Sequence, residues 1–401
     1  MNSRRAFLGQ VATGIGSFAS VQRSVLGAND RIRVGVIGYG DRGSCIAREA
    51  VGCSGVQLVA ASDVYGKQLE RAAAETPGIG VFRDHRQMLE EAALDAVLIA
   101  TPPHLHAAHF IDSVAAGKHV YVENAMAYSV EHAKQMRAAL AAAKGKPVVQ
   151  IGHQCCSFGQ AADAAKFLTP EKMGIVTAIH ASMHRNTPRG RPQWARPVYP
   201  GMTAENIAWN RFLGDAPQVP FDPIRYRNWR YFWDYSGGNV HENMSHQLAF
   251  WYKVLNLQIP NAVTMTGGLY LWQDGREVPD TMSVAMEQPE QLLFTWHSSF
   301  GNSNLGMTES VLGTDGTITK GAQIRYWPEK VNRPQGEALV GTTMTPPSAH
   351  MRNFLDCIRS GKETNCSFDV GFRVSIACRM AVESYHQRRT VYWDAAAEEI
   401  V

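Results

Sequence analysis

The feature that most constrains the fold of this chain is a strand-like run that leads straight into a glycine-rich turn. The mostly apolar run 32–37 suits a strand buried on both faces, and glycines then follow at the G-x-G-x-x-G spacing. Gly38 permits a tight turn, and Gly40 lets main chain approach a pyrophosphate. Gly43 lets the following helix, predicted over 44–51, pack closely and aim its first amides at the phosphates.

A carboxylate follows at the distance that a dinucleotide site requires. The second predicted strand, 56–62, is followed by Asp63, about 20 residues after the glycines, where a ribose diol needs an acidic partner. Together these features predict a dinucleotide site that includes the turn residues Tyr39, Asp41 and Arg42. Because Asp63 would repel a 2′-phosphate and no arginine follows it directly, the sequence favours NAD over NADP.

Strands and helices are predicted to alternate through the first part of the chain. Further strands are predicted over 96–100, 119–122 and 148–151, and the helices between the strands over 65–75, 105–116 and 130–144. This β-α-β rhythm indicates a doubly wound parallel sheet. We therefore predict an α/β fold that begins with a Rossmann domain over 29–150.

The pattern changes after residue 150. Strands with partial alternation are predicted over 176–183, 262–271, 282–287, 291–298 and 309–312, and helices over 243–254, 349–360 and 370–387. Residues 185–200, rich in proline, arginine and glycine, are expected to form an ordered loop near the site. We expect an α+β domain over 151–401, with one large, mostly antiparallel open sheet that binds substrate.

Residues 1–28 are expected to be an export signal and not part of the fold. The segment Ser3-Arg4-Arg5-Ala6-Phe7-Leu8 resembles the twin-arginine signal, and the stretch after it is too short and too polar for a permanent membrane helix. No other segment has the character of a membrane span. The predicted location is the periplasm, which offers no free nicotinamide pool. We therefore expect a tightly held cofactor that is regenerated in place.

Composition argues against several other classes of protein. A net charge of +3 over 401 residues leaves no basic footprint for nucleic acid. The chain has seven cysteines, an odd number, and none of them form a C-x-x-C pair. Both facts argue against a disulfide framework and against a zinc site. A chain of this length is long enough for two domains.

Four segments carry a resemblance to a known family. They are Val36-Ile37-Gly38-Tyr39-Gly40, Ala100-Thr101-Pro102-Pro103-His104-Leu105-His106, Tyr121-Val122-Glu123-Asn124-Ala125-Met126-Ala127 and Gly237-Gly238-Asn239-Val240-His241-Glu242-Asn243-Met244-Ser245-His246. In this order they resemble the glucose–fructose oxidoreductase/inositol dehydrogenase/MocA family. The resemblance implies a nicotinamide ring held between the two domains and sugar or cyclitol substrates. It also implies homo-oligomers built through the open sheet.

The resemblance also assigns roles to residues that match its motifs. Thr101, Pro102 and His104 match the loop that lines the cofactor. Glu123 matches the acidic residue of a Glu-Lys-Pro motif, and His246 matches the catalytic histidine.

Four positions depart from the family pattern. Asn124 stands where the family has its active-site lysine, and Ala125 replaces the proline of that motif. Glu242 takes the place of an aspartate four residues before the histidine, and Ala249 that of an aspartate three residues after it. Because an amide carries neither a charge nor a labile proton, either His246 works alone, another cation substitutes for the lysine, or activity is lost or altered.

The residue types suit the oxidation of a secondary alcohol. Such a reaction needs a base of near-neutral pKa for the hydroxyl proton, and His246 is the candidate. Glu242, one helical turn earlier, can orient the imidazole or bind a substrate hydroxyl. Arg185, Arg189 and Arg230 are the candidate substitute cations; Arg185 and Arg230, with Asn124 and His246, are also predicted to bind substrate.

Two further features bear on the site. Aromatic residues are dense before the Gly237-Gly238 turn, and Trp194 is the candidate platform for a carbohydrate ring. His241 and His246 lie five positions apart, whereas the H-E-x-x-H zinc motif needs four, so no metal site is predicted.

Three functions remain open at this point. The first is an NAD-dependent oxidoreductase acting on a secondary hydroxyl of a sugar, cyclitol or glycoside. The second is an NAD-dependent glycoside hydrolase that oxidises a sugar hydroxyl transiently and then eliminates the aglycone. The third is a non-catalytic protein that binds NAD or sugar, a reading favoured by the changes at Asn124 and Ala249.

Overall fold

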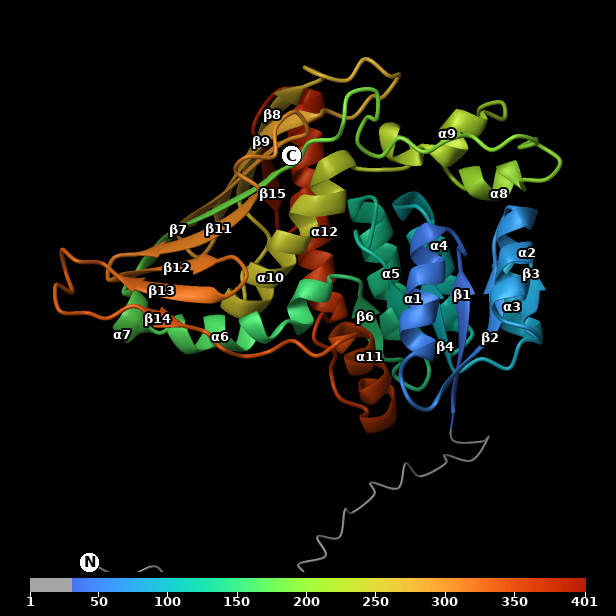
Figure 1. Ribbon diagram of the computed structural model, residues 1–401, viewed down its shortest axis with the longest axis horizontal. Coiled ribbons are helices and arrows are strands. Elements are labelled where there is room, and N and C mark those ends of the chain that lie inside the picture. The colour runs from blue at the N-terminus through green and yellow to red at the C-terminus, as the bar shows by residue number, and fades with distance from the viewer. Residues whose placement is uncertain (1–30) are drawn as a thin grey trace, which may run out of the picture.

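The computed structural model describes residues 31–401, and the predicted export signal lies outside them. Two sheets organise these residues (Figure 1), one of six strands and one of ten. The six-stranded sheet and its helices occupy the right of the view, and the ten-stranded sheet occupies the left. The predicted fold class is confirmed. The exact boundary between the two domains stays a prediction.

The six-stranded sheet is parallel and has the order β3-β2-β1-β4-β5-β6. This is the strand order of the classic dinucleotide fold, in which ligands bind where the order reverses, between β1 and β4. The strands are β1 (Ile32–Ile37), β2 (Val56–Ser62), β3 (Gly80–Phe82), β4 (Ala96–Ile99), β5 (His119–Val122) and β6 (Val149–Ile151).

The helices of this half agree with the predictions to within a few residues at most. They are α1 (Asp41–Val51), α2 (Gly66–Glu75), α3 (His85–Glu91), α4 (His106–Ala115) and α5 (Val130–Ala142), with a 3₁₀ turn at Pro103–Leu105. β3 and α3 were not predicted from the sequence. Both are short and only partly buried, so neither produces a long run of apolar residues.

The ten-stranded sheet has the order β14-β13-β12-β11-β7-β10-β9-β8-β15-β16. Only β7 and β10 pair in parallel among these described strands; their neighbours pair antiparallel. The strands are β7 (Val176–His184), β8 (Ala262–Gly268), β9 (Thr281–Gln288), β10 (Leu292–Ser299), β11 (Met307–Gly313), β12 (Gly316–Lys320), β13 (Ile324–Pro328), β14 (Leu339–Val340), β15 (Val391–Asp394) and β16 (Glu399–Ile400). The large, mostly antiparallel sheet is thus confirmed.

Helices cover one face of this sheet. The covering helices are α10 (Ser245–Leu255) and α12 (Phe368–Gln387), and Figure 1 shows both between the two sheets. Every second residue of β9 and β10 is buried against them, including Phe294 and Trp296, which share a core with Phe250 and Trp251 of α10. The remaining short elements on this side are α6 (Gly159–Phe167), α7 (Pro170–Met173) and a 3₁₀ turn at Gln154–Ser157.

Helix α11 (Ala349–Ser360) belongs by sequence to the second half but packs against the first. Its residues Met351, Phe354 and Leu355 share a core with Val34 of β1 and Ile46 of α1. The C-terminal part of the chain therefore completes the core of the dinucleotide-binding half.

One further segment, residues 201–235, reaches over the top of the six-stranded sheet; we call it the strap. It carries α8 (Trp209–Leu213), α9 (Pro223–Arg227) and a 3₁₀ turn at Trp229–Tyr231, and Figure 1 shows it beside α2 and α4. A mostly aromatic cluster gives the strap a small core of its own: Trp209, Phe212, Leu213, Tyr231, Phe232 and Tyr235. The main chain of the strap binds that of the loop after β2, with the Ala208 N–H donating to the Val64 carbonyl at 2.9 Å.

Candidate active site

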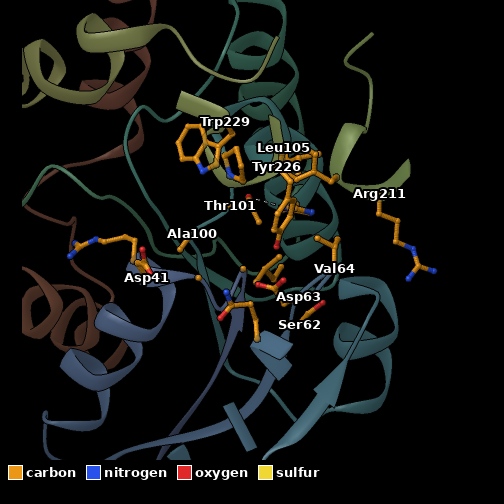
Figure 2. A pocket seen from close by; sticks show the side chains of 18 of the residues that line it. Asp41, Ser62, Asp63, Val64, Ala100, Thr101, Leu105, Arg211, Tyr226 and Trp229 are labelled. Carbon is orange, nitrogen blue, oxygen red and sulfur yellow. Dashed lines mark hydrogen bonds between the residues drawn. The ribbon is translucent and has the colours of Figure 1, made fainter. Parts of the chain in front are cut away.

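A cleft of about 800 Å³ runs between the carboxyl ends of the parallel strands and the strap. Figure 2 shows Ser62 and Asp63 at the end of β2 and Thr101 after β4, with Tyr226 and Trp229 of the strap on the opposite side. The cleft therefore lies where the strand order reverses, the usual ligand position in such sheets.

The three glycines of the turn have the geometry that their predicted roles require. Gly38 has a φ of +87°, and a Cβ there would lie 2.9 Å from the Thr101 methyl group. A Cβ on Gly43 would lie 1.8 Å from the Gly38 carbonyl oxygen, so the start of the helix presses against the turn. Nothing lies within 4 Å of a Cβ on Gly40, which lines the cleft. That open space fits a pyrophosphate lying against the main chain.

Helix α1 begins at Asp41, three residues before the predicted start. Its first turn therefore lies directly beside the cleft, which Asp41 and Arg42 line. Unpaired amides and the positive end of the helix dipole favour an anion at this place. Tyr39 contributes differently from the prediction, because its side chain is buried outside the cleft lining and its hydroxyl donates to Glu75.

Asp63 closes the far end of the cleft. It accepts the main-chain N–H of Tyr39 at 2.7 Å and that of Tyr65 at 2.8 Å, one on each carboxylate oxygen. Burial raises the pKa of Asp63 to about 6, and these two hydrogen bonds oppose the rise. Each oxygen keeps accepting capacity for a ribose hydroxyl. The residue predicted to hold the ribose thus lies in the cleft and is fixed by main chain.

A group of arginines that the sequence pattern did not predict also lies at this end of the cleft. Arg83, Arg86 and Arg211 line the same cleft as Asp63, and each lies at least 20 positions from it in the chain. Asp84 neutralises part of this charge, since it lies 2.9 Å from Arg86 and 3.2 Å from Arg211. The Arg86 hydrogen bond is the main cause that lowers the pKa of Asp84 to about 2. Because these cations lie beside the ribose site, the choice between NAD and NADP is open.

Some side chains of the loop after β4 line the cleft, and others are buried in the interior. Thr101 and Pro102 line the cleft as predicted. His104 does not, because its ring lies beneath the strap, where Nε2 bonds the Phe212 carbonyl at 2.7 Å. Burial lowers the pKa of His104 to about 4. Its position therefore supports a role in attaching the strap to the sheet instead of the predicted contact with the cofactor.

A second cavity, of about 300 Å³, adjoins the cleft and brings the remaining predicted residues together. Glu123, Asn124, Glu242 and His246 line it, and they come from two segments more than a hundred residues apart. Six residues line both cavities: Arg42, Ala100, Thr101, Trp229, Arg230 and Glu242. The two spaces therefore form one site. We call the larger end, at the glycine turn, the nucleotide end, and the smaller end, at His246, the substrate end.

Buried Glu123 pairs with a cation that the motif analysis assigned to the phosphate turn. The Arg42 Nε lies 2.8 Å from the Glu123 carboxylate, and the Tyr121 hydroxyl donates to the same carboxylate oxygen at 3.2 Å. Burial raises the pKa of Glu123, and Arg42 opposes this rise. Arg42 thus brings a positive charge next to Asn124, where the family has a lysine.

Glu242 forms the second ion pair of the smaller cavity. Its Oε2 accepts from the Arg230 Nε at 2.6 Å, and the Arg230 guanidinium lies over the Trp229 ring. The other oxygen, Oε1, is buried and has no hydrogen-bond partner in the described residues. An acceptor in this state can bind a hydroxyl of a ligand.

His246 lies in the first turn of α10, directly after a π-helical turn at Val240–Met244. The predicted helix over 243–254 is therefore present but starts irregularly, as often happens at functional sites. The His246 ring lies edge-on to that of His153, with ring centroids 5.3 Å apart. The amide of Asn124 makes only long contacts, at 3.3 to 3.5 Å, to the carbonyls of His241 and Glu242 and to the Ser245 hydroxyl.

The predicted loop 185–200 borders the larger cleft, which both Arg185 and Trp194 line. Trp194 has a φ of +70° and packs edge-to-face on Phe300 with ring centroids 5.1 Å apart. A positive φ is unusual for a tryptophan, and such backbone strain tends to occur at ligand sites. Arg189 is exposed and lies outside both cavities, so the structure removes it from the candidate cations.

No group of three or more metal-ligating side chains is found within residues 31–401. His241 is fully buried against Gly237, where an added Cβ would lie 2.2 Å from its ring. Burial lowers the pKa of His241 to about 3. Its ring therefore packs inside the protein and does not face the cavity that His246 lines. The same part of the chain contains no helix long and apolar enough to cross a membrane.

Residues 32–153 match the family model described as "Oxidoreductase family, NAD-binding Rossmann fold", with the short name GFO_IDH_MocA. A 1-carboxy-3-chloro-3,4-dihydroxycyclohexa-1,5-diene dehydrogenase of Comamonas testosteroni is 31% identical over 150 residues, 37% of either chain. A glycosyl hydrolase family 109 protein of Shewanella sp. strain ANA-3 is 30% identical over 138 residues, 31% of this chain and 30% of that one. The chain thus matches about a third of the length of these two relatives.

The likeness of folds extends further than the likeness of sequences. An aldose-aldose oxidoreductase of Caulobacter crescentus, crystallised with glycerol, superposes with a TM-score of 0.67 over 90% of this chain and 99% of that one. At 18% identity this likeness concerns the fold alone. The strand order, the glycine turn and the acidic residue after β2 agree with this match of residues 32–153 to the NAD-binding Rossmann domain of the glucose–fructose oxidoreductase/inositol dehydrogenase/MocA family.

Proposed function

We propose that the protein is an NAD-dependent oxidoreductase acting on a secondary hydroxyl of a sugar, cyclitol or glycoside. The observation that carries this proposal is the continuity of the two cavities. Six shared residues connect the glycine turn to a smaller chamber that contains a histidine and a carboxylate. A dinucleotide along the cleft would therefore present its nicotinamide end to the chamber of His246 and Glu242.

The residues of the chamber can perform the proton part of such a reaction. A bound nicotinamide ring would supply the hydride acceptor. His246 accepts the proton of the substrate hydroxyl as the carbonyl group forms. The unpartnered Oε1 of Glu242 accepts a hydrogen bond from a neighbouring hydroxyl, while Arg230 fixes that carboxylate in place. Asn124 can only donate or accept a hydrogen bond, and Arg42 supplies the nearby positive charge.

The proposal includes a choice of cofactor and a location. Asp63 favours NAD over NADP because a 2′-phosphate would lie beside its carboxylate. The expected twin-arginine signal would place the protein in the periplasm, where the cofactor has to be retained and recycled between two substrates. The uncovered face of the ten-stranded sheet is the proposed contact between copies of the chain.

A sharp test follows the fate of the bound nucleotide. Purified protein is heated to release whatever nucleotide it carries, and the nucleotide and its redox state are identified. The native protein is then mixed with free sugars and p-nitrophenyl glycosides, while the absorbance of reduced nicotinamide and of nitrophenolate is followed. Reduced nucleotide stoichiometric with the enzyme supports the proposal. A protein that carries no nucleotide and takes none up in calorimetry contradicts it.

Asp63→Ala tests the choice of cofactor. We expect weaker NAD binding and a smaller preference for NAD over NADP, measured as the ratio of the two dissociation constants. The Asp63→Asn variant is the control, because it keeps one acceptor for the main-chain N–H groups but removes the charge. An unchanged ratio in both variants would remove Asp63 from the ribose site.

One alternative has its own support. Relatives from glycosyl hydrolase family 109 and the absence of the motif lysine at Asn124 favour a hydrolase that oxidises a sugar hydroxyl transiently. The same hydride then returns after the aglycone has been eliminated. Release of nitrophenolate without net accumulation of reduced nucleotide would favour this alternative. No change in the absorbance of reduced nicotinamide or of nitrophenolate, with nucleotide still bound, would favour a non-catalytic binding protein.

A further inference from the structure

The charged side chains near the substrate end fall into pairs, with one exception. Arg42 pairs with Glu123 at 2.8 Å, and Arg230 pairs with Glu242 at 2.6 Å. Arg185 lines the same cleft as Arg230 and Glu242, yet in residues 31–401 no carboxylate lies within 4.0 Å of it and its side chain donates no hydrogen bond. Its guanidinium therefore leaves one positive charge without a counter-ion.

Arg185 is held rigidly at its main chain. It follows directly after β7, and its N–H donates to the Ser299 carbonyl of β10 at 2.9 Å. Next to this bond, the Ser298 hydroxyl donates to the Met183 carbonyl at 2.6 Å and accepts from the Asn239 amide at 2.6 Å. These bonds tie the end of β7 to the turn that precedes His246. The guanidinium thus starts from a fixed point beside the chamber, unlike that of an arginine on a mobile surface loop.

The surroundings of Arg185 are unfavourable for an isolated charge. Burial lowers its pKa from the usual value, and Glu242 opposes this only through space. A partly desolvated guanidinium is stabilised by an anion, and its planar fork matches the two oxygens of a carboxylate. The pyrophosphate of a dinucleotide has its own place at Gly40 and the start of α1.

We propose that the substrate is an acid as well as an alcohol: a sugar acid, uronate or carboxylated cyclitol whose carboxylate binds Arg185. Its hydroxyl groups would then face Glu242 and His246, both of which accept from a hydroxyl group. This inference rests on the proposed oxidoreductase function and narrows the class of substrate. A neutral sugar of the same shape would leave Arg185 without a partner and bind more weakly.

The test uses the nucleotide-loaded full-length protein and two matched pairs of probes. D-glucuronate is compared with D-glucose, and D-galacturonate with D-galactose, by calorimetric affinity and by reduction of the bound nucleotide. We expect an acid to bind at least about 10-fold more tightly than its neutral partner, the range of a charge-assisted hydrogen bond. Arg185→Gln should remove that preference, raising KM for the acid far more than it lowers kcat, and Arg185→Lys should restore part of it.

Arg189→Gln is the matched control, because Arg189 lies on the same loop but is exposed and outside both cavities. It should leave the preference intact. Four results would overturn the inference: equal binding of acids and neutral sugars, no binding of either acid, unchanged acid affinity in Arg185→Gln, or loss of nucleotide from that variant. Turnover of neutral sugars alone would overturn the inference but keep the oxidoreductase. Acid binding that depends on Arg185 without hydride transfer would keep the inference and overturn the oxidoreductase.

Discussion

The two ends of the cleft are held together by different kinds of contact. At the ribose end, main-chain groups hold the carboxylate and the strap: N–H groups of Tyr39 and Tyr65 fix Asp63, and main-chain bonds attach the strap at Val64 and Gly66. The ion pairs of Asp84 lie in the same part of the cleft. At the substrate end, side chains from distant segments meet in ion pairs and leave individual atoms without partners.

The difference shows what each end is built to do. Main-chain contacts and a helix start hold a ligand part that is common to many enzymes, and they depend little on side-chain identity. The substrate end instead presents the unpartnered Oε1 of Glu242, and the uncompensated Arg185 lines the cleft beside it. Incompletely satisfied polar groups cost stability, so their presence here is a sign of function.

The largest expected effect is at the substrate end. His246→Ala should lower turnover by about 10²- to 10⁴-fold, the range for loss of a general base. Bound nucleotide should be retained, because His246 lines the smaller cavity and not the larger cleft. The rate is measured by single-turnover reduction, and nucleotide content by heat release. Turnover equal to wild type would show that His246 is not the base.

At the nucleotide end, two glycines should respond in opposite ways. Gly43→Ala puts a methyl group 1.8 Å from the Gly38 carbonyl oxygen, and we expect a loss of about 3 kcal/mol in the free energy of unfolding. Gly40→Ala meets nothing within 4 Å, so stability should hold while nucleotide affinity falls at least about 10-fold. Thermal melting and calorimetry separate the two. Equal stability of both variants would contradict the close packing of α1 on the turn.

A buried histidine near the substrate end should make stability depend on pH. Burial lowers the pKa of His241 to about 3, and neither ring nitrogen has a partner in the described part of the chain. In the unfolded chain this histidine has a pKa of about 6.5, so below that pH it binds a proton that it does not bind in the folded protein. The contribution of neutral His241 to the free energy of unfolding is fully present above that pH and is lost as the pH falls. Between pH 7 and pH 5 the loss from this group is about 2 kcal/mol.

His241→Leu should remove this contribution and leave stability at pH 7 nearly unchanged. Urea unfolding at both pH values measures it. His104→Leu is the matched control, because the His104 ring bonds the Phe212 carbonyl and the variant should be less stable already at neutral pH. A pH dependence that His241→Leu does not reduce would assign the acid sensitivity to other groups.

The smallest expected effect concerns the strap and its role in retaining the nucleotide. Ala208→Pro removes the N–H that donates to Val64 while fitting the φ of −71° at that position. Loss of one such bond should speed nucleotide release by roughly 5- to 10-fold, measured by displacement with labelled NAD in a stopped-flow instrument. Ala208→Gly keeps the donor and serves as the control. Equal release rates would show that the strap does not retain the nucleotide.

Much of the nucleotide end could be predicted from local sequence. The strands β1 and β2 have the predicted bounds, and the roles of Gly38, Gly40 and Gly43 agree with the space around each. These features depend on residues that are neighbours in the chain. The start of α1 was placed late, because a glycine at its third position hides the first turn from a propensity argument.

The substrate end could be predicted only as a set of residues. Motif order named Glu123, Glu242 and His246, and Arg230 was one of three candidate cations. No pattern indicated that Arg42 pairs with Glu123 across 81 positions. For His104 the motif predicted a contact with the cofactor that long-range packing does not allow, because the strap covers its ring.

The sequence by itself determined the dinucleotide fold, because a glycine spacing and a carboxylate after the second strand act over short distances along the chain. The tertiary structure decided which charges pair and which remain without a counter-ion. Strand order, the strap and the turn before α10 bring Arg42, Arg185 and Arg230 to one site, and only such long-range packing sets the balance of charge that a substrate meets.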